Sequence, residues 1–329
     1  MPFFMLLIWK QGITQELSCY ILLTLSLVGY PVVQAQEFPT KPITLINPMG
    51  AGGSHDLTMR AVTSVANDYL GQPMIVQIKS GGGGAIGCEL VAKAAPDGYT
   101  LLIGGPGWNT TLPAVEGRSK GPDDLIPICR INYSANNFVA RADAPFKNLT
   151  EMIAWAKANP GQLKFGHSGL WGAADVPWKE LMKKTGITSK VIPYDGGGPC
   201  MVALLGGHID VTANFTAQAL PQVKAGKMRI LAVLDEKRHA EYADVPTAKE
   251  QGVDVVYLMW RGVLAPKGTP RPIVDKLAAA FKKMTEDKAV VAMIKSFGDV
   301  PNFLGPDEFG KLWRAEYELH KEMGKLYKK

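Results

Sequence analysis

Short apolar runs alternate with longer stretches in which apolar residues recur at helical spacing, and this alternation continues along most of the chain. In its first part, apolar runs predict strands over residues 43–47, 74–78 and 99–103. The amphipathic stretches after the first two runs predict helices over residues 54–70 and 85–95. This strand–helix–strand order favours a largely parallel sheet covered by helices.

The middle and the end of the chain continue the pattern. We expect strands over residues 138–141, 163–166, 191–193, 209–213 and 229–233. We expect helices over residues 150–159, from the loop at 167–172 to 184, from about 199 onward, and over 218–225, 270–286, 288–297 and 306–327. The first helix of the chain would bury an apolar stripe formed by Leu57, Ala61, Val65 and Tyr69.

Two glycine-rich turns each stand between a predicted strand and a predicted helix. The first spans residues 48–56 (PMGAGGSHD), and the second spans residues 194–199 (YDGGGP). Backbone N–H groups at the start of a helix lack intrahelical acceptors and lie at the positive end of the helix dipole. Each turn is therefore a candidate site for a carboxylate or a phosphate. Together they indicate a cleft that holds an acidic small molecule from two sides.

The first 35 residues are typical of a secretory signal rather than of the fold. An apolar run at residues 17–33 follows a segment with the cation Lys10, and small residues lead to a cleavage point that we expect after Ala35. An uncleaved membrane anchor is the alternative. Pro31 and the shortness of the run disfavour it, because a spanning helix needs about 20 apolar residues.

Size and charge narrow the function classes. The part of the chain after the signal has about 290 residues, which favours two lobes over one core. The formal net charge is +6, but the basic residues are scattered, so we expect no nucleic-acid partner. Cys88, Cys129 and Cys200 lack the spacing of a zinc site. We expect them to be buried thiols, with one disulfide as the alternative, and we expect no metal.

Two patterns that could suggest an enzyme are weak. Residues 82–87 satisfy the GxGxxG spacing of a dinucleotide site, but Asp97 comes too early to be its acidic partner. His167 and Ser168 are neighbours in the sequence, and their surroundings are not the five-residue nucleophile elbow. We therefore expect no catalytic residue and no cofactor, and hence no enzyme.

Short motifs spread over nearly the whole mature chain carry a family resemblance. In order, they are residues 38–43 (FPTKPI), 48–56, 71–73 (GQP), 92–100 (AKAAPDGYT), 158–161 (ANPG), 193–197 (PYDGG), 206–210 (GGHID), 225–227 (AGK), 245–247 (VPT) and 265–270 (APKGTP). In these motifs the chain resembles the extracytoplasmic solute receptors of tripartite tricarboxylate transporters, the Bug-type receptors. Each motif is weak alone, and together they are highly specific.

The resemblance implies an α/β fold of the type II periplasmic binding protein kind, with two α/β lobes joined by two crossing strands and a ligand cleft between them. Residues 36–131 and 261–329 would form the first lobe, and residues 132–260 the second. The resemblance also implies a periplasmic monomer, a small organic acid as ligand and membrane permease subunits as partners. In such receptors, backbone N–H groups of both turns hold the ligand carboxylate.

The predicted ligand site combines the two turns. Small residues let the backbone of the first turn approach an anion, and they are Gly50, Ala51, Gly52, Gly53 and Ser54. The second turn contributes Tyr194, Gly196, Gly197 and Gly198. The Ser54 hydroxyl could also cap the helix. We expect Asp56 to support the turn and His55 to be exposed. Asp195 should point to solvent, because a carboxylate beside an anionic ligand is unfavourable.

Five further residues complete the predicted site. Ser168 and Gly169 lie in a loop that borders the cleft in similar receptors. Trp108 with Asn109, and Trp171, stand where small or polar residues are usual in the family. If both indoles face the cleft, they form flat walls that suit a carboxylate with a planar or apolar body. The alternative is that both indoles pack between loop and lobe.

The sequence therefore favours a non-catalytic receptor that closes two lobes around a carboxylate and passes it to a permease. Two alternatives stay open. One is an exported sensor whose closed form docks on a membrane kinase, and the other is a nucleotide-using enzyme built on the glycine loop.

Overall fold

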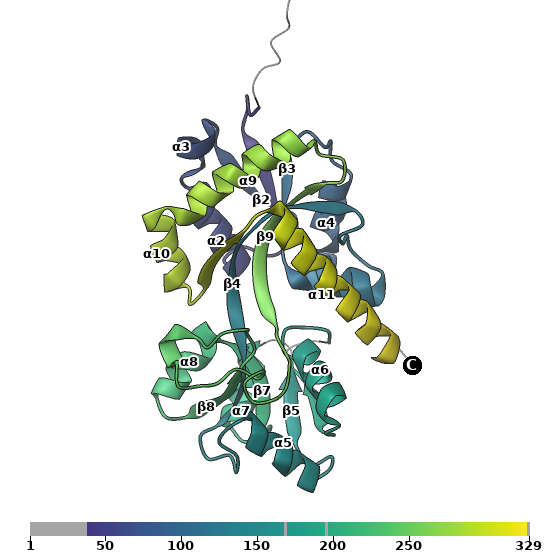
Figure 1. The fold of residues 1–329 in the computed structure, drawn as a ribbon, viewed down its shortest axis with the longest axis vertical. Coiled ribbons are helices and arrows are strands. Elements are labelled where there is room, and N and C mark those ends of the chain that lie inside the picture. Colours follow the sequence, from purple (N-terminus) through teal and green to yellow (C-terminus); the bar gives the residue numbers. More distant parts are fainter. Residues whose placement is uncertain (1–37, 168–169, 195–196, 328–329) are drawn as a thin grey trace, which may run out of the picture. The chain divides into compact units, whose positions relative to one another are not determined.

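The computed structural model describes residues 38–167, 170–194 and 197–327, so the predicted signal lies outside the described residues. Residues 41–329 form one compact unit of mixed α/β structure, as predicted (Figure 1). Its strands are β1 (Ile43–Asn47), β2 (Met74–Ile78), β3 (Thr100–Gly104), β4 (Leu125–Arg141), β5 (Lys164–His167), β6 (Lys190–Pro193), β7 (Val211–Phe215), β8 (Met228–Val233), β9 (Leu258–Pro266) and β10 (Val300–Leu304).

The helices alternate with these strands. They are α2 (Ser54–Thr63), α3 (Ala66–Leu70), α4 (Ala85–Ala92), α5 (Leu149–Ala158), α6 (Asp175–Thr185), α7 (Gly197–Leu205), α8 (Thr216–Lys224), α9 (Arg271–Glu286), α10 (Lys288–Ser296) and α11 (Pro306–Tyr327). Shorter or irregular turns are η1 (Gly82–Gly84), the π-helical η2 (Gly107–Glu116) and η3 (Ala240–Tyr242). Within the described ranges, no helix combines the length and the apolar composition that crossing a membrane requires.

Strand β4 organises the sheet. It pairs antiparallel with β9 over residues 125–135, and with β7 and β8 over residues 136–141. The prediction of a largely parallel sheet was wrong, because β4 and β9 pair antiparallel with their neighbours, and only the β1–β2, β1–β3, β5–β6 and β5–β7 pairings are parallel among the described strands. The hydrogen-bonded order is β2-β1-β3-β9-β4-β7-β5-β6, and β8 and β10 also pair with β4. We call β1, β2, β3, β9 and β10 the first group and β5 to β8 the second group. Figure 1 shows β4 and β9 running from one group toward the other.

Each group has its own apolar core. In the first group, the Trp260 ring of β9 meets the Phe309 and Trp313 rings of α11, with centroids 5.0 Å and 6.3 Å away. In the second group, Phe165 of β5 stacks on Trp178 of α6 with centroids 4.0 Å apart. Full burial of one such side chain contributes about 1.5–3 kcal/mol, which holds the helices on the sheet.

Most predicted elements match the observed ones to within three residues at each end. The predicted strand at 138–141 is only the end of β4, which has 17 residues. Strand β10 was not predicted. Its sequence contains a proline, and its pairing with β4 changes register between Pro301 and Leu304, so it lacks the alternation that marks a regular strand.

The first predicted helix was wrong in extent and partly wrong in its buried face, since Ala61 of the predicted stripe is buried and Val65 is half-buried. It is split into α2 and α3, and Leu57 and Tyr69 of the predicted stripe are 39% and 37% exposed. Met59 and Val62 are fully buried instead. Residues spaced by four advance about 400° around a helix, so a stripe at that spacing drifts away from the core.

Candidate functional site

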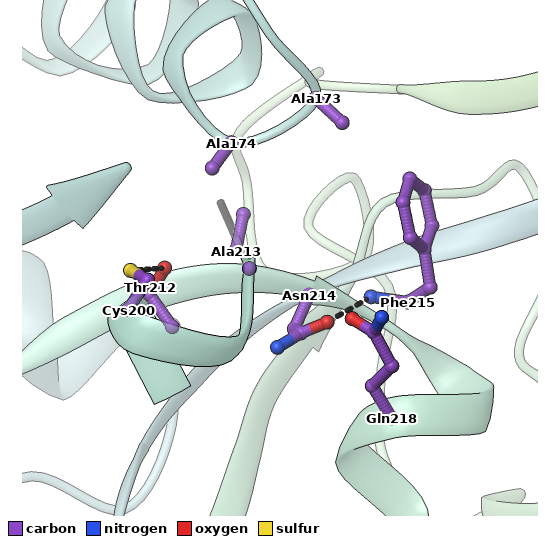
Figure 2. A pocket seen from close by; sticks show the side chains of 9 residues that line it. Ala173, Ala174, Cys200, Thr212, Ala213, Asn214, Phe215 and Gln218 are labelled. Atoms are coloured by element: carbon purple, nitrogen blue, oxygen red, sulfur yellow. Dashed lines mark hydrogen bonds between the residues drawn. The ribbon is translucent and has the colours of Figure 1, made fainter. Parts of the chain in front are cut away.

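A cavity of about 150 Å³ lies at the carboxyl end of β7, where α7 and α8 begin (Figure 2). It is lined by Ala173, Ala174, Gly197, Cys200, Thr212, Ala213, Asn214, Phe215 and Gln218. Ligand pockets usually enclose about 300–1,000 Å³. The cavity is therefore large enough for one end of a small ligand and too small for a complete enclosed site.

The polar groups in this cavity are uncharged. The Asn214 Oδ1 accepts a hydrogen bond of 2.9 Å from the Phe215 N–H (Figure 2), and no described residue accepts from the Asn214 Nδ2. The Thr212 hydroxyl donates to the Gly166 carbonyl over 2.8 Å. Gln218 is exposed. The side chains therefore offer amide donors to a ligand without adding a charge.

Two helices start at the cavity wall. Gly197 is the first residue of α7, and Gln218 lies in the first turn of α8. Phe215 precedes α8 in an extended conformation and supplies no side-chain cap. First-turn N–H groups without a cap carry partial positive charge and favour an anion. Both helices have nine residues, long enough for this effect.

The first glycine-rich turn is exposed and braced from within. Gly50 to Ser54 are all exposed, and Gly53 precedes α2 without a side-chain cap. Asp56 supports the turn as predicted, because its carboxylate accepts from the Gly52 N–H over 2.9 Å and from the Asn47 Nδ2 over 3.2 Å. The Gly52 N–H is thus already bonded within the protein, which leaves the N–H groups after it for a ligand.

The ionisation of Asp56 strengthens this brace. Burial acts to raise the pKa of the carboxyl, but hydrogen bonds from Arg60, the Gly52 N–H and Asn47 outweigh it and lower the pKa. The Arg60 Nε lies 3.0 Å from the Asp56 Oδ2. The carboxylate therefore stays charged and keeps the turn in shape at neutral pH.

Two expectations about the start of α2 were wrong. Ser54 does not cap the helix, because it is the first helical residue and its hydroxyl accepts a hydrogen bond of 2.8 Å from the Arg261 Nη2. His55 is not exposed: it is 7% exposed, and its ring centroid lies 4.6 Å from that of Trp108. Burial, with the nearby charge of Arg261, holds the pKa of His55 well below its ordinary value, so the ring is neutral.

The sequence left open whether Trp108 and Trp171 face the cleft or pack inside the protein, and both side chains are buried. Trp108 is 6% exposed, and its indole N–H donates to the Ile103 carbonyl over 3.2 Å. Trp171 is 8% exposed and belongs to the core of the second group. Neither lines the cavity. Asn109 is fully buried, and its Nδ2 donates to the Lys120 carbonyl over 2.9 Å. Ligand contacts by these three side chains stay predictions.

The cavity gathers only part of the predicted site. Gly197 lines it, whereas Gly50 to Ser54 of the first turn do not. Gly198 is exposed, and Tyr194 is half-buried with its N–H bonded to the His167 carbonyl over 2.9 Å. Four other predicted positions, Ser168, Gly169, Asp195 and Gly196, lie outside the described residues.

The sequence did not predict that the end of β7 and the start of α8 form part of the cavity wall. Thr212, Asn214, Phe215 and Gln218 line the cavity, yet the β7–α8 connection has no glycine to mark it. The available signal was its place in the pattern, because it is one more strand-to-helix junction. In open α/β sheets, ligands bind outside the carboxyl ends of strands.

The arrangement suits binding rather than chemistry. Among the described residues that line the cavity, only Cys200 has a titratable side chain, and burial raises the pKa of its thiol, which disfavours a nucleophilic thiolate. The three described cysteines are free and buried, as predicted. Across the part of the chain that the structure describes, no three His, Cys, Asp or Glu residues are placed to hold a metal ion.

The glycine run at residues 82–87 has a packing role. A Cβ on Gly84 would approach the Cβ of Trp108 to 2.8 Å, and a Cβ on Gly87 would approach the Cβ of Pro48 to 2.8 Å. Both distances are shorter than real Cβ contacts, so these glycines let the run lie directly against η2 and the first turn.

Known proteins resemble this chain in sequence and in structure. The sequence profile of the tripartite tricarboxylate transporter family receptors (TctC) matches residues 58–318. BugT of Bordetella pertussis is 33% identical over 284 residues, which cover 84% of this chain and 86% of BugT. A ligand-free TctC solute-binding protein from Polaromonas is 31% identical with a TM-score of 0.81, over 87% of this chain and 98% of that chain.

Two solved structures from Rhodopseudomonas palustris contain ligands. MatC with bound malate is 27% identical with a TM-score of 0.68, over 87% of this chain and 100% of that chain. A second protein, solved with adipate, is 27% identical with a TM-score of 0.71, over 88% of this chain and 98% of that chain. The profile match and the relatives show that this chain belongs to the TctC/Bug family of tripartite tricarboxylate transporter receptors, which are solute-binding proteins and not enzymes.

Proposed function

We propose that this receptor captures a small aliphatic dicarboxylate in the periplasm and delivers it to the membrane permease subunits of its transporter. The observation that carries the proposal is the uncharged polar cavity at the starts of α7 and α8. The described residues of the cavity wall include no cation, so a carboxylate is held there by backbone N–H groups, helix dipoles and amide side chains. The malate and adipate in similar proteins are dicarboxylates, which supports the same ligand class here.

The proposal includes two lobes that close on the ligand. Residues 36–131 with 261–329 form one lobe, and residues 132–260 form the other. Two observations support this division: among the described strands only β4 pairs with members of both groups, and the described residues that line the cavity all belong to the second of these lobes. Closure brings the first turn onto the ligand and excludes water, which strengthens the hydrogen bonds to the carboxylates.

The location and the partner also belong to the proposal. Residues 1–35 direct export and are removed after Ala35, and the mature chain acts as a monomer. The support for export is the apolar run at residues 17–33 together with the family, whose receptors serve a membrane transporter.

Calorimetry and thermal unfolding of the protein with malate, adipate and their neutral diamides test the ligand class. A dicarboxylate at 100 times its dissociation constant should add about 2.7 kcal/mol of stability, and the diamides should add none. Equal effects of diacid and diamide would contradict the carboxylate role.

Two glycine variants test the two turns separately. Gly53 and Gly198 have ordinary φ angles, and no atom of the described residues lies closer than 3.8 Å to an added Cβ, so valine at either position should preserve the fold. Gly53→Val fills the first turn, and Gly198→Val fills the start of α7. We expect each variant to lose diacid binding at an unchanged melting temperature. Retained binding in one variant would remove that turn from the site.

A further inference from the structure

The loop between α10 and β10 touches the helix that borders the ligand cavity. A Cβ on Gly298 would lie 2.8 Å from the Cβ, 3.2 Å from the Cα and 3.4 Å from the N of Ala217. Ala217 is the second residue of α8 and directly precedes the cavity-lining Gln218. The loop of the first group therefore supports the first turn of a helix that belongs to the second group.

The next residue anchors this loop in the centre of the protein. Asp299 is 6% exposed, and its Oδ2 lies 3.2 Å from the Nη1 of Arg261 on β9. The carboxylate also accepts from the Asn132 Nδ2 over 3.1 Å and from the Ser134 hydroxyl, both on β4. Because both strands that join the two groups bind Asp299, the loop has little freedom to retreat.

Arg261 extends the connection to the first glycine-rich turn. Its side chain is 2% exposed, and its Nη2 donates to the Ser54 hydroxyl over 2.8 Å. Ser54 begins α2, at the first predicted carboxylate site, and Ala217 lies in the first turn of α8, beside the cavity that Gly197 of the second predicted site also lines. A continuous set of contacts thus joins the first turn to the cavity through Arg261, Asp299 and Gly298.

We infer that Gly298 and the Arg261–Asp299 pair set the separation between the first turn and α8, and thereby determine which length of dicarboxylate the receptor accepts. The inference rests on the proposed function for its ligand. Gly298, Asp299 and Arg261 are positioning residues in this scheme, because they act through Ala217 and Ser54 rather than by touching the ligand.

Gly298 is the position at which a small substitution should change this separation. With φ of +75° and Ala217 against its open face, position 298 has room for a hydrogen and none for a methyl group. A methyl group must displace one neighbour. Asp299 is held by Arg261, Asn132 and Ser134, so α8 is the partner that moves, and the gap between the first turn and the cavity wall at α8 widens.

Gly298→Ala tests the inference, with Gly226→Ala as the matched control. Gly226 lies just beyond the other end of α8, has φ of +68° and has no atom within 4 Å of an added Cβ. Both alanines therefore carry the same left-handed backbone strain, and only the one at 298 pushes on α8. Ala217→Gly combined with Gly298→Ala removes the opposing methyl group and should reverse the effect.

Two readouts are needed. The first is the distance between spin labels at Ile86→Cys on α4, which is 57% exposed, and Lys224→Cys on α8, whose side chain is 67% exposed. The native Cys88, Cys129 and Cys200 are buried. The second is calorimetric affinity for malate and adipate. We expect Gly298→Ala to lengthen the label distance, and to weaken malate binding about tenfold and adipate binding less than about threefold. Gly226→Ala should match the wild type in both.

The outcomes separate the inference from the proposed function. Two results would overturn the inference that Gly298 sets the separation: a label distance in Gly298→Ala equal to that in Gly226→Ala, or equal losses of affinity for the two diacids. Wild-type protein that binds neither diacid would contradict the proposed ligand, while the label distance would still decide whether position 298 sets the spacing. If Gly298→Ala fails to fold and the Ala217→Gly double variant does not restore it, the inferred contact is wrong.

Discussion

Arg261 donates a hydrogen bond of 2.8 Å from its Nη2 to the hydroxyl of Ser54, and this bond fastens the first glycine-rich turn to β9, one of the two strands that run between the groups. The guanidinium is almost completely buried, whereas Ser54 is exposed at the start of α2. A buried charge thus holds an exposed turn in one conformation. Such preorganisation favours binding, because the ligand then meets N–H groups that are already oriented.

Ser54→Ala should weaken dicarboxylate binding while leaving the fold intact. The substitution removes the acceptor of the Arg261 hydrogen bond, and a hydrogen bond to a charged group contributes about 1.5–3 kcal/mol. We expect malate affinity, measured by calorimetry, to fall about tenfold. Ser54→Thr keeps the hydroxyl and should keep most of the affinity.

Ser64→Ala is the matched control on the same helix. The Ser64 hydroxyl donates only to the Ala61 carbonyl over 2.7 Å, at the opposite end of α2. Its loss should leave malate affinity at the wild-type value. If both alanine variants bind malate equally well, the Arg261–Ser54 bond has no part in holding the ligand turn.

The raised pKa of Glu316 should make the free energy of unfolding fall as the pH rises from about 4.5 to about 7. Burial raises the pKa of Glu316 from 4.5 to about 7, although hydrogen bonds from Trp260 over 2.7 Å and from Thr110 over 3.2 Å favour the charged form. Between these pH values the folded state holds a proton that the unfolded state has released. The free energy of unfolding therefore falls as the pH rises through this range.

Glu316→Gln removes the titratable carboxyl and should flatten the dependence of the free energy of unfolding on pH in this range. Relative to the wild type, the variant should gain on the order of 2 kcal/mol of stability between pH 5 and pH 8 in denaturant unfolding. His320, whose pKa burial lowers to about 4, acts in the opposite direction in both proteins and cancels in the difference. A constant difference between variant and wild type over this range would show that Glu316 releases its proton at an ordinary pH.

The order of strands and helices could be predicted because most turns carry local signals. The proline and glycine residues at 160–161 end α5, and the glycines at 50, 52 and 53 precede α2, as expected from their backbone preferences. Asp56 could be assigned its bracing role from charge alone, since a carboxylate beside an anionic ligand is unfavourable. The family resemblance added the long-range order that local patterns lack.

The buried polar contacts could not be predicted, because they join residues far apart in the sequence. Nothing around Ser54 indicates a partner 207 positions later, and His55 was expected to be exposed because its burial depends on Trp108 and Arg261. The cavity wall at Asn214 was missed for a related reason: the β7–α8 junction uses ordinary residues, and only the fold places it beside Gly197.

Asn214→Asp should abolish binding of a dicarboxylate without harming the fold. Aspartate has the same shape, and its carboxylate can still accept from the Phe215 N–H as Asn214 does over 2.9 Å. The new negative charge lies in the cavity and repels a carboxylate in a partly desolvated site. We expect affinity for malate and adipate to fall about 100-fold or more.

Asn67→Asp is the control: it adds the same charge at an exposed position of α3 and should leave affinity within about twofold. Equal affinities in the two variants would place the ligand outside this cavity.

Trp171→Ala should cost stability and should not distinguish aromatic from aliphatic acids. The Trp171 side chain is 8% exposed in the core of the second group, and the Lys179 Nζ lies 4.8 Å from its ring centroid. The backbone N–H of Trp171 donates to the Asp175 Oδ2 over 2.7 Å, a bond that the alanine variant keeps. Truncating a packed tryptophan costs about 3–5 kcal/mol, which chemical unfolding would detect.

Trp171→Gly is a second variant for the same position. Because Trp171 has φ of +59°, Trp171→Gly should be no less stable than Trp171→Ala. Benzoate and malate affinities should change by the same factor in either variant. A selective loss of benzoate binding would instead assign the indole to the ligand wall, and would mean that Trp171 leaves its place in the core when the receptor closes.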